Sequence, residues 1–194
     1  MSFAPASVRS AEVGNQLRAS YDPVTIALHW LTVALVVVLF GTAWIWNNTP
    51  RDWHWHPPLE FAHVSFGILF AAVIVVRLVW RALKGRSLPS AERGLVALAA
   101  QTVHSVLYML LALQVVLGFS LRLFQGEAFS FFGLFSIPDP LTQSRATAHL
   151  LEQMHNFFGW AIIYAALAHA AAALFHHFVL RDRVLGRMAP AIEG

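Results

Sequence analysis

Four long apolar stretches, separated by shorter polar segments, dominate the hydropathy pattern of the chain. A helix needs about 20 mostly apolar residues to cross a membrane, and each stretch is long enough. The predicted helices run over residues 24–46, 59–80, 95–123 and 153–179. Asp22-Pro23 is typical of a helix start, and Pro57-Pro58 marks a break before the second helix. The pattern therefore predicts an all-α fold, an integral membrane four-helix bundle.

The Lys and Arg residues predict how these helices are oriented. Ten of them lie on the side that would hold both termini, whereas Arg51, Arg122 and Arg145 lie on the other side. Because positive charge is enriched in cytoplasmic segments, both termini are predicted to be cytoplasmic. The predicted organisation is a disordered cytoplasmic tail, a membrane domain and a short C-terminal tail, over residues 1–20, 21–188 and 189–194.

The composition is typical of a membrane protein and excludes several classes of function. The 194 residues are 58% hydrophobic and 12% charged, and a soluble domain usually carries about twice that share of charge. The formal net charge of +3 lies mostly beside apolar segments, which argues against nucleic-acid binding. The chain has no cysteine, which excludes disulfides, iron–sulfur clusters and covalent c-type haem attachment.

Histidine is the residue type that carries the candidate chemistry. Seven of the ten histidines fall within the apolar stretches, namely His29, His63, His104, His155, His169, His176 and His177. An ionisable side chain is costly at membrane depth and therefore indicates a functional site. Any one of them alone could equally be structural, so the prediction depends on how they are arranged.

Four of these histidines form two pairs at matching depths in the predicted bundle. His155 and His169 share one face of the fourth helix and lie about 21 Å apart along its axis, so one metal ion cannot bind both. The direction of each helix places His63 at the depth of His155, near the outer surface. It places His29 at the depth of His169, in the inner leaflet.

The residues around these histidines favour haem over other metal centres. Gly67 follows His63 by four residues and Gly159 follows His155 by four, so each glycine lies on the face of its histidine. The missing side chains would leave the flat slot that a porphyrin needs, although close helix packing also uses glycine. Histidines paired across facing helices suit axial ligation, whereas zinc would require three or four ligands. The absence of mid-span carboxylates also disfavours a carboxylate-based proton pump.

The segments that carry the histidines resemble the prokaryotic cytochrome b561 family. They are IALHW (26–30), AHVSFG (62–67), MHNFFG (154–159) and LAHAAAALFHH (167–177), and the similarity extends from about residue 21 to residue 188. The haem-ligating histidines of that family match His29, His63, His155 and His169. The resemblance implies two b haems in opposite leaflets of a bacterial inner membrane.

Two axial histidines leave no open iron position, so such a protein would pass single electrons across the bilayer. The resemblance implies ubiquinone as a partner, and some members of the family resemble superoxide oxidases, which take electrons from superoxide and reduce quinone. The leading hypothesis is therefore an oxidoreductase of this kind. One alternative is a cytochrome b subunit fed by a partner dehydrogenase or hydrogenase. Another is a four-helix membrane protein without haem.

Polar residues near each surface are candidates for binding the electron donor and acceptor. On the cytoplasmic side, the candidates for a quinone site are His176, Arg86, Arg93, His104 and Tyr108. Each could instead pack in the bundle or extend to the interface. On the outer side, the three Arg residues could steer superoxide or bind haem propionates. The long aromatic outer loop, about residues 124–151, could lie on the interface or cover a site.

Overall fold

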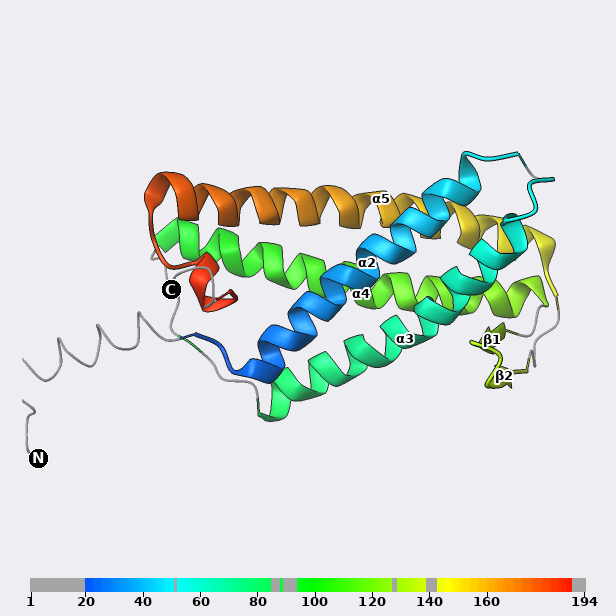
Figure 1. Cartoon of the computed structure of the whole chain (residues 1–194), viewed down its shortest axis with the longest axis horizontal. Coiled ribbons are helices and arrows are strands. Elements are labelled where there is room, and N and C mark those ends of the chain that lie inside the picture. The colour runs from blue at the N-terminus through cyan, green and yellow to red at the C-terminus, as the bar shows by residue number, and fades with distance from the viewer. Residues whose placement is uncertain are drawn as a thin grey trace, which may run out of the picture.

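Four long helices make up most of the structure, a computed structural model that describes residues 20–50, 52–84, 88, 94–126, 129–138 and 143–189 (Figure 1). The helices are α2 (Pro23–Asn47), α3 (His56–Leu83), α4 (Gly94–Gln125) and α5 (Arg145–Phe175). A π-helical turn, η1 (His176–Leu180), extends α5, and a short 3-10 helix, η2 (Leu185–Arg187), follows. All four helices are long and apolar enough to cross a membrane, which confirms the predicted all-α membrane bundle.

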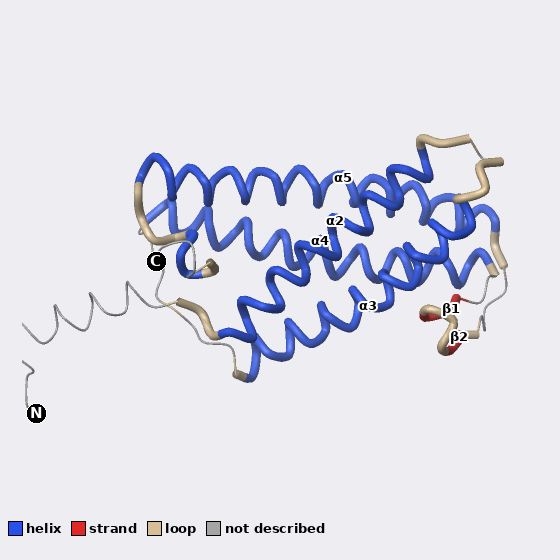
Figure 2. Tube along the Cα trace, viewed as in Figure 1, coloured by secondary structure: helices blue, strands red, loops and turns tan. Residues whose placement is uncertain are grey.

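A small β-hairpin interrupts the helical chain between α4 and α5 (Figure 2). Its strands, β1 (Phe129–Phe131) and β2 (Phe135–Ile137), are antiparallel, and Ser130 pairs with Ser136. The sequence predicts only an aromatic loop over this segment. We call the end of the bundle that carries the hairpin, where α3 and α5 begin, the hairpin end.

The described ends of the chain meet at the opposite end of the bundle, which we call the terminus end. The backbone N–H of Tyr21 donates to the carbonyl of Arg187 over 3.0 Å. The indole N–H of Trp30 donates to the carbonyl of Met188 over 3.0 Å. Both predicted tails fall almost wholly outside the described residues, and the cytoplasmic location of the terminus end stays a prediction.

Two helix starts differ from the predicted positions, and a third agrees. Asp22 caps α2 as expected, because its carboxylate accepts a hydrogen bond from the backbone N–H of Thr25 over 2.9 Å. Helix α3 begins at His56, so the two prolines lie within its first turn and do not precede it. The first turn tolerates proline because its N–H groups have no partner inside the helix.

Helix α5 begins at Arg145, eight residues before the predicted start at residue 153. The hydroxyl of Ser144 accepts a hydrogen bond from the backbone N–H of Thr147 and caps the helix. Hydropathy marks only the part of a helix that is apolar enough for lipid, so it missed the polar first two turns.

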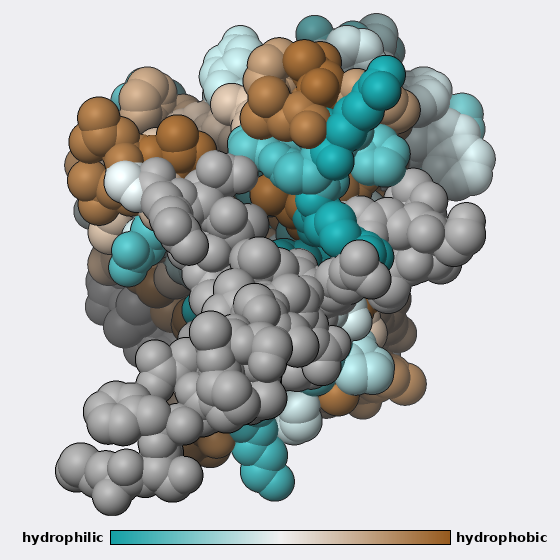
Figure 3. Space-filling view, turned by 90° about the vertical axis from the view of Figure 1, so that its left-hand side faces the viewer, coloured by the Kyte–Doolittle hydropathy of each residue, from teal (hydrophilic) through white to brown (hydrophobic). Residues whose placement is uncertain are grey.

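The core of the bundle is small and lies at mid-height. Helix α2 packs mainly on α3, and α4 packs mainly on α5. The buried core residues come from all four helices and are Leu35, Phe70, Val73, Ile74, Leu111 and Ile162. Most other apolar side chains are exposed, as lipid-facing residues are, and a view onto the terminus end has apolar patches at the flanks of the molecule (Figure 3).

Candidate functional site

His63 of α3 and His155 of α5 face each other at the hairpin end. Their ring centroids are 6.2 Å apart, and the ring planes make an angle of 79°. A metal–imidazole bond is about 2.1 Å long and the bonding nitrogen lies about 1.2 Å from its ring centroid, so rings on opposite sides of one ion have centroids about 6.5 Å apart. The observed spacing therefore fits a single iron held between the two rings.

His29 of α2 and His169 of α5 form a second pair towards the terminus end. Their ring centroids are 6.5 Å apart, and the ring planes make an angle of 72°. All four histidines are half-buried. The structure thus brings together the two pairs that helix direction and depth predicted, each with the spacing that axial ligation requires.

The imidazole of His63 is held with one nitrogen towards the protein. Its Nδ1 lies 3.1 Å from the carbonyl oxygen of Leu39 and 3.1 Å from the hydroxyl of Thr42, both on α2. A carbonyl can only accept, so Nδ1 carries the ring proton and Nε2 keeps its lone pair. Histidines that bind metals are commonly oriented in this way, with the second nitrogen donating to a backbone carbonyl.

Helix α4 shapes the surroundings of His155 through two residues that sequence reasoning missed. A Cβ placed on Gly118 would lie 3.1 Å from Cε1 of His155, so any larger residue here would push this ring by a few tenths of an ångström. Gln114, one turn earlier, donates from Nε2 to the backbone carbonyl of His155 over 3.0 Å. Gln114 Oε1 and His155 Nδ1 are buried and have no hydrogen-bond partner among the described residues. Unpaired buried polar atoms are rare, and these two fit a polar site completed by a bound group.

The predicted glycine slots differ from each other. A Cβ placed on Gly67 would have no heavy atom within 4 Å, so there is open space at this position on α3. A Cβ on Gly159 would lie 3.4 Å from Nε2 of Gln114, which is contact distance. The slot that the sequence predicted is therefore open beside Gly67, whereas the side chain of Gln114 closes it beside Gly159.

Arg77 joins the terminus-end pair to a tyrosine, whereas the sequence predicts for it only a position on the cytoplasmic side. Its Nη2 lies 3.2 Å from Nδ1 of His29, and its Nε donates to the hydroxyl of Tyr108 over 3.2 Å. The guanidinium carbon also lies 5.0 Å from the centroid of the Tyr108 ring. A charged residue within the apolar run of α3 was the signal that could have identified it.

The structure places the candidates for a quinone site differently. His104 and Tyr108 lie on α4 near the terminus-end pair: the ring centroid of His104 is 5.1 Å from that of His169, and Tyr108 lies one turn further along the helix. His176 is bonded through Nδ1 to the carboxylate of Asp182 over 2.5 Å. Arg86 and Arg93 lie outside the described residues.

A surface hollow lies beside the end of α5. It has a volume of about 330 Å³ and is lined by His177, Arg181, Asp182 and Arg183. Asp182 links this hollow to His176, since one carboxylate oxygen bonds the imidazole and the other accepts from the backbone N–H of Val184 over 3.0 Å.

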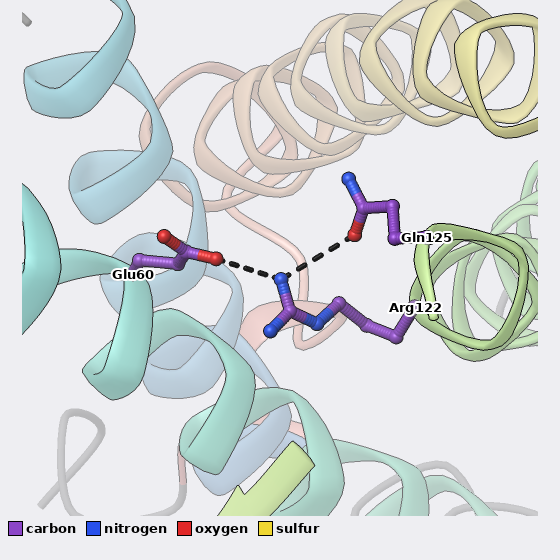
Figure 4. Close-up of polar contacts among 3 residues, drawn as sticks. All are labelled: Glu60, Arg122 and Gln125. Carbon is purple, nitrogen blue, oxygen red and sulfur yellow. Dashed lines mark hydrogen bonds and ion pairs between the residues drawn. The ribbon is translucent and has the colours of Figure 1, made fainter. Parts of the chain in front are cut away.

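Of the three Arg residues predicted on the outer side, Arg122 is paired with an acid. Its Nη1 lies 2.7 Å from Oε1 of Glu60 and 3.3 Å from Oε1 of Gln125 (Figure 4). The ion pair joins α3 to α4. The carboxylate of Glu60 thereby balances the positive charge of Arg122, which was predicted to steer superoxide or bind a haem propionate. Arg145 is exposed at the start of α5, and Arg51 lies outside the described residues.

Comparisons with known proteins agree with the arrangement of these helices and histidines. A family model described as prokaryotic cytochrome b561 matches residues 20–191. Cytochrome b561 homolog 2 of Escherichia coli (strain K12) is 31% identical over 170 residues, which cover 87% of this chain and 90% of that protein. The protein named probable superoxide oxidase CybB of Yersinia pestis is 27% identical over 180 residues, covering 92% of this chain and 100% of that protein. Cytochrome b561 homolog 1 of Escherichia coli (strain K12) is 26% identical over 174 residues.

Proposed function

The chain belongs to the prokaryotic cytochrome b561 family, and we propose that it holds two b haems that carry single electrons from one face of the membrane to the other. Members of this family are multi-pass proteins of the bacterial inner membrane that bind haem b and transport electrons. The proposal of two haems rests on the two histidine pairs. The ring centroids are 6.2 Å apart within the pair at the hairpin end and 6.5 Å apart within the pair towards the terminus end. His63 and His155 would hold one iron, and His29 and His169 the other.

The residues around each pair have distinct roles in this proposal. A haem at each pair would supply a one-electron redox centre, and two imidazoles on each iron would leave no position for oxygen or substrate. The hydrogen bond from His63 to the carbonyl of Leu39 fixes that ring and raises its basicity as a ligand. Ile162 lies midway between the two α5 histidines, in an apolar core that keeps water out between the pairs.

We place superoxide oxidation at the hairpin end and ubiquinone reduction at the terminus end. Two superoxide anions would each lose one electron and become O2, and one ubiquinone would take up the two electrons with two protons to become ubiquinol. The similarity to a protein named a probable superoxide oxidase supports this reaction. Positive charge at the terminus end is what predicts that this end faces the cytoplasm.

The quinone would bind beside the terminus-end pair. His176 follows His169 by two helical turns on the same face of the helix, about 10 Å further along the axis. Its hydrogen bond to Asp182 gives it a route to pass protons from the surface to a reduced quinone. His104, beside His169, and Tyr108, one turn further along α4, offer further polar contacts, and Arg86 and Arg93 remain candidates.

The first experiment measures haem content. We expect two haems per chain and a reduced-minus-oxidised spectrum with b-type Soret and alpha bands. If the purified protein lacks these bands, the histidines are structural and the protein has no haem. One haem per chain would contradict the proposal of two haems.

The second experiment adds an enzymatic source of superoxide and ubiquinone to the haem-loaded protein. We expect ubiquinol to form in a superoxide-dependent way, and superoxide dismutase in excess to prevent it. If haem is present and quinone is not reduced, the cytochrome b subunit of a dehydrogenase or hydrogenase becomes the better reading.

A further inference from the structure

Helices α4 and α5 lie side by side along the bundle (Figure 1), and the ring of His155 rests against one face of α4. Gln114 and Gly118, one turn apart, lie on this face. The Cβ position of Gly118 is 3.1 Å from Cε1 and 3.6 Å from Nδ1 of His155. Gln114 donates from Nε2 to the backbone carbonyl of His155 over 3.0 Å. One turn of α4 therefore meets both the ring and the backbone of this histidine.

The space for the Gln114 side chain comes from Gly159, one turn after His155 on α5. A Cβ on Gly159 would lie 3.4 Å from Nε2 of Gln114, so the amide already occupies the room beside this glycine. Glycines on facing helices let the helices approach closely. The amide of Gln114 is thereby enclosed between α4 and α5, in contact with His155.

Two polar atoms in this contact are buried and have no hydrogen-bond partner within the part of the chain that the structure describes. They are Oε1 of Gln114 and Nδ1 of His155. The bond to the His155 carbonyl requires an N–H at the other end of the amide, so the unpaired amide atom is the oxygen, an acceptor. Nδ1 can donate or accept, depending on which ring nitrogen carries the proton.

Ligation of iron would decide the state of Nδ1. This nitrogen is buried on the side of the ring that faces Gly118, so Nε2 is the nitrogen that remains for an iron shared with His63. A neutral imidazole that binds metal through Nε2 carries its proton on Nδ1. Ligation would then give two touching residues one buried donor and one buried acceptor, and each group is costly to leave unpaired.

His63, on the other side of the pair, has the acceptor that His155 lacks. Nδ1 of His63 lies 3.1 Å from the carbonyl oxygen of Leu39, an acceptor fixed by the backbone of α2. Nδ1 of His155 has no such carbonyl among the described residues. The oxygen of Gln114 is a buried acceptor on the helix that this ring faces, which makes it the group available to Nδ1–H.

We propose that Gln114 is a positioning residue for His155, and that its side-chain oxygen accepts the hydrogen bond from Nδ1–H when the ring binds iron. One side chain would then hold both the backbone and the ring of the same ligand. The inference rests on the proposed haem at His63 and His155. An acceptor at Nδ1 makes an imidazole a more basic ligand, which favours the ferric state. Gln114 would therefore lower the midpoint potential of this haem.

Replacing Gln114 by Met tests this role in the full-length, haem-loaded protein. Met matches the length of Gln but has no N–H group and is only a weak acceptor. We expect the potential of the hairpin-end haem to rise by about 60 mV, which corresponds to a tenfold loss of preference for the ferric state. A redox titration at the alpha band measures it, and the haem at the terminus end should not shift. An unchanged or lower potential at the hairpin end would overturn the proposal.

Gln114→Glu separates the acceptor from the contact with the backbone. Both variants lose the amide N–H that bonds the His155 carbonyl, but Glu keeps an oxygen acceptor on a side chain of the same length. We expect the ferric g-values of the hairpin-end haem to change in Gln114→Met and to stay near the original in Gln114→Glu. Equal changes in the two variants would overturn the acceptor role. If Gln114→Met loses this haem, retention in Gln114→Glu supports the acceptor role and loss from both overturns it.

Gln101→Leu is the matched control on the same helix. Gln101 is exposed and precedes Gln114 by 13 residues, about 20 Å along α4. We expect it to leave the hairpin-end potential unchanged, and a rise equal to that of Gln114→Met would overturn the proposal. Absence of haem from the unsubstituted protein would remove the proposed function together with this inference. Two haems with an unmoved potential in Gln114→Met would remove this inference alone.

Discussion

Nη2 of the Arg77 guanidinium lies 3.2 Å from Nδ1 of the His29 imidazole. Because an arginine can only donate, Nδ1 accepts in this arrangement and the ring proton lies on Nε2. A histidine that binds iron through Nε2 has its proton on Nδ1 instead, as His63 does when it donates to Leu39. Ligation by His29 through Nε2 therefore requires Arg77 to release Nδ1, while its bond to Tyr108 keeps the positive charge nearby.

Replacing Arg77 by Gln should lower the midpoint potential of the haem held by His29 and His169. A nearby positive charge disfavours the oxidised iron, which carries one more positive charge, so its removal stabilises the oxidised state. A unit charge about 8–10 Å from the iron in a medium of effective dielectric constant about 20 is worth roughly 2 kcal/mol, or about 50–100 mV. A redox titration followed at the alpha band measures the shift.

Arg81→Gln is the matched control for this prediction. Arg81 lies one turn further along α3 and is exposed, so water and salt screen its charge. We expect it to shift the same potential much less. Equal shifts in the two variants, or a rise in potential for Arg77→Gln, would contradict a direct effect of Arg77 on this haem.

Alanine replacements of the four paired histidines should remove the haems in a fixed pattern. His63→Ala and His155→Ala should lose the same haem, and His29→Ala and His169→Ala the other, because each iron needs both of its rings. Haem content per chain and electron paramagnetic resonance of the ferric protein distinguish the two centres. Loss of the same haem from the His63 and His169 variants would show that the pairing is wrong.

His104→Ala provides the control for these replacements. Its ring centroid lies 5.1 Å from that of His169, less than the about 6.5 Å expected across a shared iron. We therefore expect this variant to keep both haems. A missing haem would mean that His104, and not His29, is the partner of His169.

Replacing Gly118 by Ala should disturb only the haem at the hairpin end. The added Cβ would lie 3.1 Å from Cε1 of His155, so the ring must shift by a few tenths of an ångström. We expect a change in the ferric g-values or the occupancy of that haem, and a larger change for Gly118→Val. The haem at the terminus end serves as the internal control, and equal disturbance of both haems would point to general misfolding.

Sequence reasoning located the paired histidines because helices constrain position strongly. Once the direction of each span is assigned, a fixed rise per residue converts the positions of His29 and His63 into depths, and the structure brings each ring to its expected partner. The residues of α4 escaped prediction for the opposite reason. Gln114 and Gly118 matter only because one face of α4 turns towards His155. A polar residue inside an apolar span is the signal that could have identified Gln114, but the sequence of α4 does not say which helix that face meets.

The hairpin escaped prediction because its stability comes from a partner distant in sequence. Its strands have three residues each, and a two-stranded hairpin of this size is marginal on its own. Phe132 adopts a left-handed backbone, with φ of 48°, which is unfavourable for a bulky residue and needs support from its surroundings. Ser65 and Phe66 supply that support, and nothing in the local sequence of the hairpin indicates them.

The ion pair between Glu60 and Arg122 should tune the haem at the hairpin end with opposite signs. Glu60 precedes His63 by three residues and so lies near it on α3, and its carboxylate is 2.7 Å from the guanidinium of Arg122. Removing the negative charge by Glu60→Gln disfavours the oxidised iron and should raise the potential. Arg122→Gln removes the positive charge and should lower it.

The double variant decides whether these shifts are electrostatic. The pair is neutral as a whole, so Glu60→Gln combined with Arg122→Gln should return the potential close to its original value, with the haem at the terminus end unchanged throughout. A redox titration of the four proteins gives the coupling directly. Shifts of the same sign in both single variants would instead mean that loss of the α3–α4 contact distorts the site, because charge alone cannot move the potential in one direction for two opposite substitutions.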